Sequence, residues 1–306
     1  MNNKIKILLA PTLELAEHVL GSEYVFLTVE AEYGLHVAEG CLYTAAHHQA
    51  AGSPYAGRHV VAGGRPSPCN DGDIPHHGEG AILVSHVDLD TFGGCLRALP
   101  GFDGLFGPEG QGFWDLAETI DVRGAHKLPQ SGAVAADVSM LRAFWAWSKG
   151  VPRFPRDSVT DVTETVIAAG GALLRILAGD AQLLAEGEAF GAAEAALNAR
   201  TCAPIAGYRH VLRRSSDGPF CNHLYTTPGG EYFPAVVAHN VETGSVTVSL
   251  ADPIPGVSCR DLVQALWGTE AGGHAGIAGS PRGRVMTASD FEAAAAALET
   301  AIADHV

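Results

Sequence analysis

The fold is decided by the stretch Ala81-Ile-Leu-Val-Ser-His-Val-Asp-Leu-Asp-Thr-Phe-Gly-Gly-Cys95. Its first four residues are apolar and predict a short buried strand. Residues 91–94 contain two glycines and predict a turn, after which we expect a helix to begin near Cys95. A buried strand that leads through a turn into a helix is typical of an α/β protein with a parallel sheet.

Three polar side chains follow this predicted strand at alternate positions, namely His86, Asp88 and Asp90. If the chain stays extended, the three converge on one side of the strand end, because alternate side chains of a strand point the same way. One imidazole and two carboxylates are ligands that suit Mn, Zn, Mg or Fe. The alternative interpretation is that the three residues only cap the strand and the helix after it.

The composition indicates a protein that acts on a small molecule. The chain has 306 residues, 47% of them hydrophobic, which is enough for one large domain or two. Its net charge of −15 disfavours a nucleic-acid polymer as a partner, because an acidic surface repels a phosphate backbone. No apolar run reaches membrane-spanning length, and the six cysteines show neither a zinc-finger nor a disulfide spacing. We therefore expect a cytoplasmic protein with a small-molecule substrate, without membrane contact, and with a homodimer left open.

The predicted elements divide the chain into two lobes of an α/β fold. Residues 1–156 are expected to form an N-terminal lobe with a parallel sheet and the metal site. Residues 157–200 are expected to be a helical connector, and residues 201–306 a smaller mixed α/β lobe that binds the substrate. The expected strands are residues 4–10, 24–30, 81–84, 208–213, 220–226, 233–239 and 245–251. The expected helices are residues 12–20, 113–119, 133–148, 160–200 (divided or bent at its glycines), 258–266 and 289–303, the last with Ser289 as its N-cap.

A second motif lies near the C-terminus, in a loop that is rich in glycine. It reads Gly272-Gly-His-Ala-Gly-Ile-Ala-Gly-Ser-Pro-Arg-Gly-Arg284. Backbone N–H groups in such a loop can approach an anion closely, because glycine has no Cβ to block the approach. His274, Arg282 and Arg284 could add charge-assisted hydrogen bonds to the same anion. The alternative is a tight turn with a surface histidine.

Together the two motifs resemble the DHH phosphoesterase family with its C-terminal DHHA1 domain. The family's H-x-D-x-D motif is matched by His86-Val-Asp-Leu-Asp90, and its G-G-G-H-x-x-A-A-G loop by Ala271-Gly-Gly-His-Ala-Gly-Ile-Ala-Gly279. The hairpin expected over residues 236–250 is similar to the strand pair that precedes the loop in that family. The family's Asp-His-His triplet is absent from this chain.

The resemblance implies a metal site whose missing ligands come from elsewhere in the chain. One alternative is the pair His47 and His48, with Ala46 in place of the aspartate, and the other is Asp121 with His126. The expected metal ligands are then His86, Asp88, Asp90, Asp121, His47 and His126. The expected catalytic residues are Asp88, Asp90, His47 and His48. The expected substrate contacts are Gly272, Gly273, His274, Arg282 and Arg284.

The function implied is that of a metal-dependent phosphoesterase that hydrolyses a small phosphorylated or nucleotide-like substrate in a cleft between the lobes. The expected cofactor is a divalent metal, manganese first, with magnesium and zinc as alternatives. Two other functions stay open: a non-catalytic small-molecule binding protein on the same scaffold, and a metal hydrolase that acts on an amide or ester bond. A serine-hydrolase elbow and a dinucleotide-binding fingerprint are both absent from the sequence.

Overall fold

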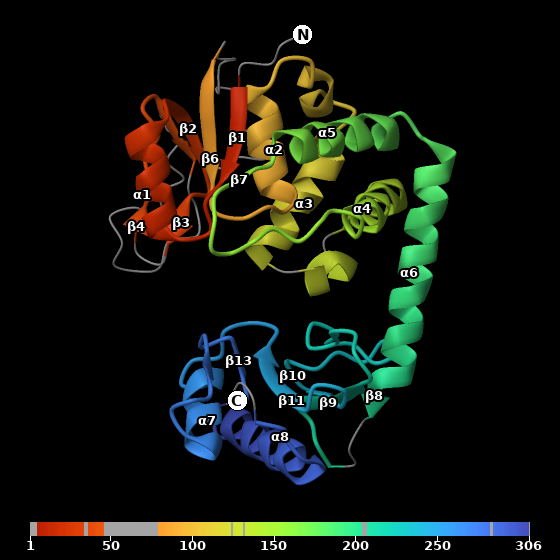
Figure 1. Ribbon diagram of the computed structural model, residues 1–306. Coiled ribbons are helices and arrows are strands. Elements are labelled where there is room, and N and C mark those ends of the chain that lie inside the picture. Colours follow the sequence, from red (N-terminus) through yellow and green to blue (C-terminus); the bar gives the residue numbers. More distant parts are fainter. Residues whose placement is uncertain are drawn as a thin grey trace. The chain divides into compact units, whose positions relative to one another are not determined.

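The computed structural model describes residues 5–33, 36–45, 79–123, 125–130, 132–203, 207–281 and 284–305. It divides into two compact units, shown in Figure 1. Unit 1 comprises Met1–Val122 and Leu128–Phe190, and unit 2 comprises Arg123–Lys127 and Gly191–Val306. Each unit contains a sheet and helices, so the α/β class predicted from the sequence is confirmed.

Unit 1 is built on a five-stranded sheet in the order β5-β2-β6-β1-β7. Four strands run parallel, β1 (Ile5–Leu9), β2 (Val25–Val29), β5 (Tyr43–Ala45) and β6 (Gly80–Val84). The edge strand β7 (Thr160–Asp161) runs antiparallel to β1. The carboxyl ends of β2, β5, β6 and β1 therefore lie at one edge of the sheet, where open α/β sheets bind their ligands.

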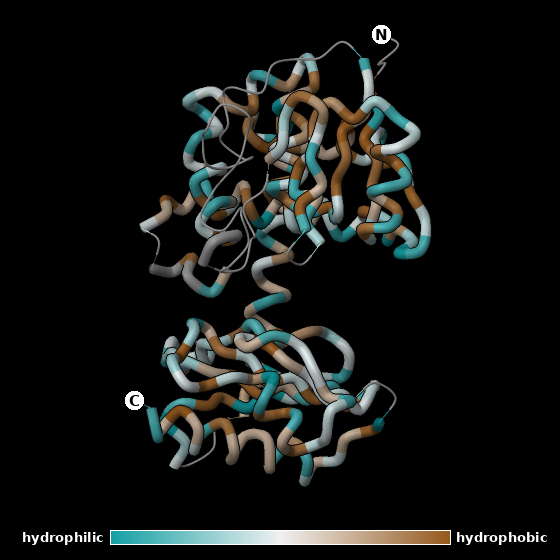
Figure 2. The backbone as a smooth tube through the Cα atoms, turned by 90° about the vertical axis from the view of Figure 1, so that its left-hand side faces the viewer, coloured by the Kyte–Doolittle hydropathy of each residue, from teal (hydrophilic) through white to brown (hydrophobic). Residues whose placement is uncertain are grey.

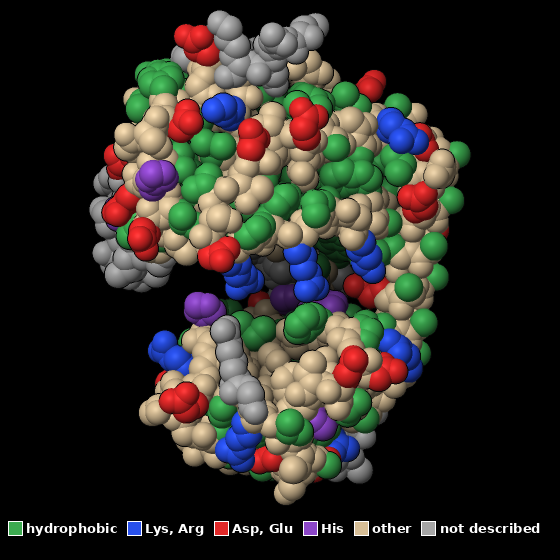
Figure 3. Space-filling model, in the orientation of Figure 1, with side chains coloured by type: hydrophobic (Ala, Val, Ile, Leu, Met, Phe, Trp, Pro, Cys, Tyr) green, Lys and Arg blue, Asp and Glu red, His purple; other side chains and the backbone are tan. Residues whose placement is uncertain are grey.

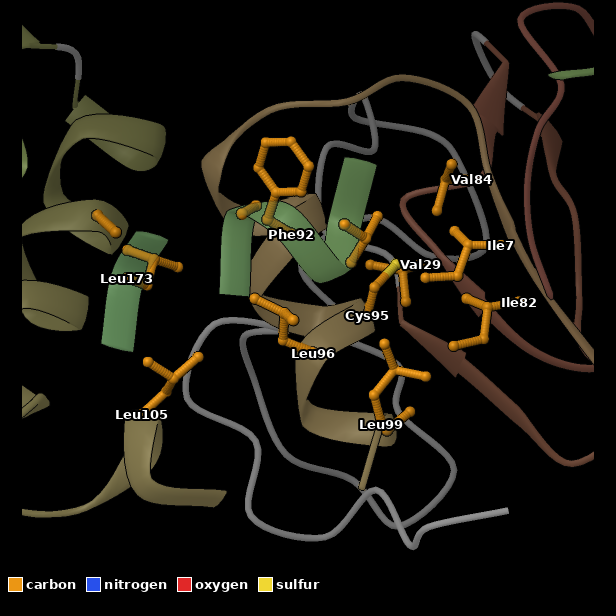
Figure 4. Close-up of a cluster of buried hydrophobic side chains, with 14 of the residues drawn as sticks. Ile7, Val29, Ile82, Val84, Phe92, Cys95, Leu96, Leu99, Leu105 and Leu173 are labelled. Carbon is orange, nitrogen blue, oxygen red and sulfur yellow. The ribbon is translucent and has the colours of Figure 1, made fainter. Parts of the chain in front are cut away.

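Helices cover both faces of this sheet, and the strands bury alternate side chains on each side. Ile7 and Ile82 pack with the larger core, whereas Leu8 and Leu83 pack on the opposite face with α1 (Leu13–Ser22). Because both faces are covered, most strand residues are apolar, and the exposed Lys6 of β1 is an exception. Figure 2 colours the backbone by hydropathy and shows many hydrophobic (brown) stretches in both units. Figure 4 shows how Ile7, Ile82 and their neighbours meet the apolar side of the first long helix after β6.

The larger core is formed with four helices, α2 (Leu89–Ala98), α3 (Gln111–Arg123), α4 (Ala135–Ser148) and α5 (Thr163–Leu177). The 3-10 segments η1 (Asp103–Phe106) and η2 (Ala125–Gln130) flank α3, and a small hairpin pairs β3 (Glu32–Tyr33) with β4 (His36–Val37).

The turn predicted at residues 91–94 is wrong, because α2 already begins at Leu89. Phe92, Cys95, Leu96 and Leu99 are spaced so that one helical face enters the core, and this packing outweighs the low helix propensity of two glycines.

The long helix predicted over residues 160–200 is two helices, α5 and α6 (Ala181–Thr201). The two helices meet at 95°. The break falls at Gly179, whose φ of +78° a residue with a side chain rarely adopts. Gly170 does not interrupt α5, since a Cβ there would lie 2.4 Å from the ring of Phe102 and the glycine permits close packing instead. In the described part of the chain, no single helix is long and apolar enough to cross a membrane, although α5 and α6 taken together satisfy length and composition.

Unit 2 contains a six-stranded sheet in the order β12-β13-β11-β10-β9-β8. Its strands are β8 (Cys202–Ala203), β9 (Val211–Ser216), β10 (Ala235–Asn240), β11 (Ser245–Leu250), β12 (Gly272–Gly273) and β13 (Ile277–Gly279). The helices α7 (Cys259–Trp267) and α8 (Ala288–Ala303) share one core with the sheet. The hairpin predicted from β10 to β11 is confirmed, with Gly244 at a φ of +66°.

Two details of unit 2 differ from the prediction. Residues 220–226 are not a strand; Arg214 donates hydrogen bonds to the carbonyls of Leu224 and Thr226 and fixes this segment as a loop. The N-cap of α8 is Thr287, not Ser289, because Thr287 and Asp290 form a reciprocal capping box that Ser289 cannot make.

Candidate metal centre

Two neighbouring parallel strands end side by side and bring Glu30 next to Ser85 and His86. Val29, the last residue of β2, pairs with Val84, the last residue of β6. Glu30 and Ser85 each follow directly, so their positions at the carboxyl edge are set by the register of the sheet. Glu30 adopts a φ of +48°, an uncommon conformation for a residue with a side chain, which is often found at functional sites.

The start of α2 places the two aspartates. Asp88 is the N-cap, and its Oδ1 accepts hydrogen bonds from the backbone N (3.2 Å) and Oγ1 (2.6 Å) of Thr91. Asp90 lies in the first helical turn and is only 5% exposed. The expected extended backbone from His86 to Asp90 is therefore wrong, because capping turns the chain into a helix at Asp88. Asp88 therefore does cap the helix, as the alternative interpretation expected, but it uses only Oδ1 to do so, and its Oδ2 faces His86.

Three side chains converge at this edge with their ligand atoms within 4.8 Å of one another: Glu30, His86 and Asp88. His86 Nε2 lies 3.2 Å from Glu30 Oε2 and 2.9 Å from Asp88 Oδ2. Glu30 is fully buried, whereas the side chains of His86 and Asp88 are 43% and 47% exposed. The cluster thus has a buried base and a side that is open to solvent.

Ser85 fixes the orientation of the His86 ring. Its hydroxyl donates a hydrogen bond to the backbone carbonyl of Glu30, and the same oxygen lies 2.9 Å from His86 Nδ1. Because the hydroxyl has one hydrogen and gives it to the carbonyl, it can only accept from Nδ1–H. A neutral His86 consequently carries its proton on Nδ1 and presents the lone pair of Nε2 to Glu30 and Asp88.

The close approach of three carboxyl groups shifts their protonation. The pKa of Asp90 is raised to about 12. Burial is the largest cause, and the hydrogen bonds and charges of Glu30 and Asp88 act in the same direction. The pKa of His86 is raised to about 10: burial opposes the rise, but hydrogen bonds and charges from Asp88 and Glu30 exceed it. Burial by itself would raise the pKa of Asp88, but the hydrogen bonds with His86 and Asp90 outweigh it, so the pKa of Asp88 is lowered. At neutral pH, one proton on Asp90 and one on His86 therefore reduce the repulsion among the carboxyl groups of the cluster.

This donor set fits a divalent cation. Carboxylate oxygens and one imidazole nitrogen are ligands for Mn²⁺, Mg²⁺ and Zn²⁺, and those of Glu30, His86 and Asp88 lie within 4.8 Å of one another. A cation between them would take the place of the protons on Asp90 and His86. Ser85 then acts as the outer partner that orients a histidine ligand.

Glu30 and Ser85 were missed in the sequence because they lie outside the H-x-D-x-D spacing. Glu30 precedes His86 by 56 residues, and only the pairing of β2 with β6 joins them. A signal was nevertheless present, since Glu30 directly follows an apolar strand, as Ser85 does.

Of the other predicted metal ligands, only His126 has a described side chain. His47 and His48 lie outside the described residues. Asp121 lies in α3, and its side chain is outside the described part of the structure. His126 lies in η2 and belongs to unit 2, where its ring centroid is 4.9 Å from that of Tyr225.

The predicted anion-binding loop forms a hairpin of β12 and β13 in unit 2. Gly273 has a φ of +147°, and a Cβ there would lie 2.5 Å from the carbonyl oxygen of Ile277, so the turn requires glycine. His274 is exposed next to it, and its backbone N donates to Ile277 O. Arg284 forms an ion pair with Asp290, with 3.4 Å between its Nη2 and Asp290 Oδ1. Arg282 lies outside the described residues.

Comparisons with known proteins give little beyond the geometry. No family model matches the chain, and no curated protein matches it. Among solved structures, one match is the pGpG-specific phosphodiesterase PggH from Vibrio cholerae, with 12% sequence identity and a TM-score of 0.38. The alignment covers 76% of this chain and 82% of that one.

Proposed function

We propose that this protein is a metal-dependent phosphoesterase that acts on a small phosphorylated or nucleotide-like substrate, with Mn²⁺ as the first candidate cation. The observation that carries the proposal is the cluster of Glu30, His86 and Asp88, with Asp90 beside it, at the carboxyl edge of a parallel sheet. The motif resemblance of residues 86–90 gives the reaction class. When bound, a divalent cation polarises a phosphoryl oxygen and lowers the pKa of a coordinated water.

Each residue of the cluster has a separate task. His86 would bind through Nε2, Asp88 through Oδ2 and Glu30 through its buried carboxylate. Asp88 Oδ1 stays engaged with Thr91, which keeps Oδ2 directed at the cluster. The exposed side of His86 and Asp88 leaves room for the substrate, while the buried base excludes water from the far side.

Asp90 holds a proton on its carboxyl group when no cation is bound, as its raised pKa requires. In that state its single O–H donates to either Glu30 or Asp88, and its neutral charge reduces the repulsion within the cluster. Once a cation reduces the repulsion instead, Asp90 can ionise and serve as a further ligand.

The remaining predicted residues stay part of the proposal. His47 and His48 follow the last residue of β5, Ala45, within three positions in the sequence and are kept as further ligands. Asp121 and His126 are kept as the alternative pair. Gly272, Gly273, His274, Arg282 and Arg284 are kept as substrate contacts.

The test uses the full chain, treated with EDTA and then supplied with Mn²⁺, Mg²⁺ or Zn²⁺. Hydrolysis is measured on bis(4-nitrophenyl) phosphate, 4-nitrophenyl phosphate, 4-nitrophenyl acetate and a 4-nitroanilide. We expect turnover of a phosphoester only with metal, and a loss of at least about 100-fold in Glu30→Gln and Asp88→Asn.

Asp88→Asn is chosen because asparagine caps a helix as well as aspartate does, so α2 is retained while a ligand is removed. Unchanged turnover in both variants would contradict the proposal. Cleavage of the acetate or the anilide alone would assign a different hydrolase, and metal binding without any turnover would indicate a binding protein.

A further inference from the structure

The short segment after Glu30 crosses the carboxyl end of β6 and is tied to β1. In the sheet of unit 1, β6 lies between β2 and β1. Glu30 directly follows β2, and Tyr33 lies three residues further on. The phenol hydroxyl of Tyr33 donates a hydrogen bond of 2.7 Å to the carbonyl of Ala10, the residue after β1. Residues 31–33 therefore span the end of the strand that leads to Ser85 and His86.

The backbone of Glu30 needs support from its surroundings. Its φ of +48° is unfavourable for a residue with a side chain, and such a conformation persists only where neighbouring contacts impose it. The N–H of Glu30 donates to the carbonyl of Ala45 at 2.8 Å. Its carbonyl accepts hydrogen bonds from the N–H of Glu32, at 2.8 Å, and from the hydroxyl of Ser85. These bonds hold the peptide groups on both sides of Glu30, and they last only as long as the chain beyond Glu32 stays in place.

Tyr33 anchors this chain to the sheet. The pairing of Tyr33 with His36 in the hairpin of β3 and β4 is local, because it joins the segment only to the residues that follow it. The hydrogen bond to Ala10 instead connects the segment to β1, two strands away from β2. The ring of Tyr33 also packs against the smaller core of unit 1, which contains Ala10 and Leu83. The hydroxyl and the ring of one side chain thus fix the far end of the turn that begins at Glu30.

The anchor is an uncharged contact in an acidic part of the protein. Glu14 and Glu17 are exposed on α1, and Figure 3 shows Asp and Glu side chains on the surface of unit 1 around this helix. Burial raises the pKa of Tyr33 well above its usual value, so the phenol keeps its proton at neutral pH. A neutral donor is not repelled by the nearby carboxylates, and its hydrogen bond should therefore depend little on salt.

We propose that Tyr33 is a positioning residue of the candidate metal centre, which holds the backbone turn at Glu30 through its hydrogen bond to Ala10 and so keeps the Glu30 carboxylate directed at His86. The inference rests on the proposed function for the role of the cluster, but the support of Glu30 can be tested without metal. Glu30 Oε2 lies 3.2 Å from His86 Nε2, so a change in the turn moves a ligand atom of the cluster. Outer partners that orient a metal ligand contribute to metal affinity in this way.

The first experiment measures amide hydrogen exchange of residues 30–33 in the full chain in EDTA. Tyr33→Phe keeps the ring and removes the hydroxyl. Thr163→Val is the matched control, because Thr163 Oγ1 accepts a hydrogen bond of 2.8 Å from the N–H of Ile7, in the middle of β1. We expect the Glu30 and Glu32 amides to exchange about 3- to 10-fold faster in Tyr33→Phe, from the usual net strength of one hydrogen bond, and at wild-type rates in Thr163→Val. Unchanged exchange in Tyr33→Phe, or equal acceleration in both variants, overturns the proposal.

The second experiment titrates the same three proteins with Co²⁺, whose visible absorption reports its coordination. We expect Tyr33→Phe to bind Co²⁺ about 3- to 10-fold more weakly and with an altered spectrum, because the Glu30 oxygen is no longer held in place. Thr163→Val should match the wild type in both affinity and spectrum. Wild-type affinity in Tyr33→Phe, or equal weakening in both variants, overturns the proposal. If the wild type binds no Co²⁺, the proposed function is contradicted, whereas the exchange experiment still decides whether Tyr33 supports Glu30.

Discussion

Replacing Asp90 by asparagine tests the proton that the cluster holds without metal. Asp90 is 5% exposed, and its pKa is raised from an ordinary 3.8 to about 12. The folded protein therefore binds this proton at neutral pH, whereas the unfolded chain releases it. The free energy of unfolding consequently falls as the pH rises above about 4, and it continues to fall toward pH 12.

The size of the stability change follows from the difference between pH 7 and the pKa of Asp90 in the unfolded chain. At pH 7 the unfolded carboxyl lies about three pH units above its pKa, and each unit corresponds to about 1.4 kcal/mol. Asp90→Asn removes this cost, because the introduced amide is neutral in both states and can still donate to Glu30 and Asp88. We expect the metal-free variant to be more stable than the wild type at pH 7 by at least about 1 and at most about 4 kcal/mol, and equally stable near pH 4.

The assay is urea denaturation in EDTA between pH 4 and 8, followed by tryptophan fluorescence. Three of the four tryptophans, Trp114, Trp145 and Trp147, lie in unit 1, so the signal reports mainly the unit that holds Asp90. Asp115→Asn, an exposed carboxylate on α3, serves as the control and should follow the wild-type pH profile. If Asp90→Asn shows the wild-type pH profile, or is less stable at pH 7, Asp90 is ionised in the metal-free protein and the reasoning is refuted.

Three further predictions concern the site and the glycine hairpin. Ser85→Ala should weaken metal affinity by roughly 10- to 100-fold in a calorimetric titration, because His86 loses its orienting partner; an unchanged affinity would contradict that role. Metal affinity should rise with pH between 6 and 9, because His86, with a pKa raised to about 10, must lose its proton to bind; a flat profile in a chelator competition would count against it. Gly273→Ala should destabilise unit 2 by about 2 kcal/mol or more in thermal unfolding, because of its φ of +147° and the close Ile277 carbonyl, whereas Gly272→Ala, with nothing within 4 Å, should change little. Similar losses in both glycine variants would argue against that explanation.

The strands and helices were predictable where the hydrophobic period was strong. The first two strands of unit 1 and the hairpin from β10 to β11 lie within a residue or two of their predicted limits. The start of α2 was not predictable from the two glycines of residues 91–94, because the helix is stabilised by packing of Phe92 and Leu96 in the core. Local propensity decides little when a helix is buried on the face of a sheet.

The candidate site was half predictable, for a reason of topology. His86, Asp88 and Asp90 stand close in sequence, so their spacing was visible. Glu30 joins them only through the register of β2 with β6, which no local pattern encodes.

The most direct test of the account is a crystal structure of the protein grown with Mn²⁺, with anomalous data collected at the manganese edge. The account predicts an anomalous peak within about 2.0–2.3 Å of His86 Nε2, Asp88 Oδ2 and a carboxylate oxygen of Glu30. A crystal in which Mn²⁺ binds elsewhere, or in which Glu30, His86 and Asp88 surround no peak, would contradict the central claim.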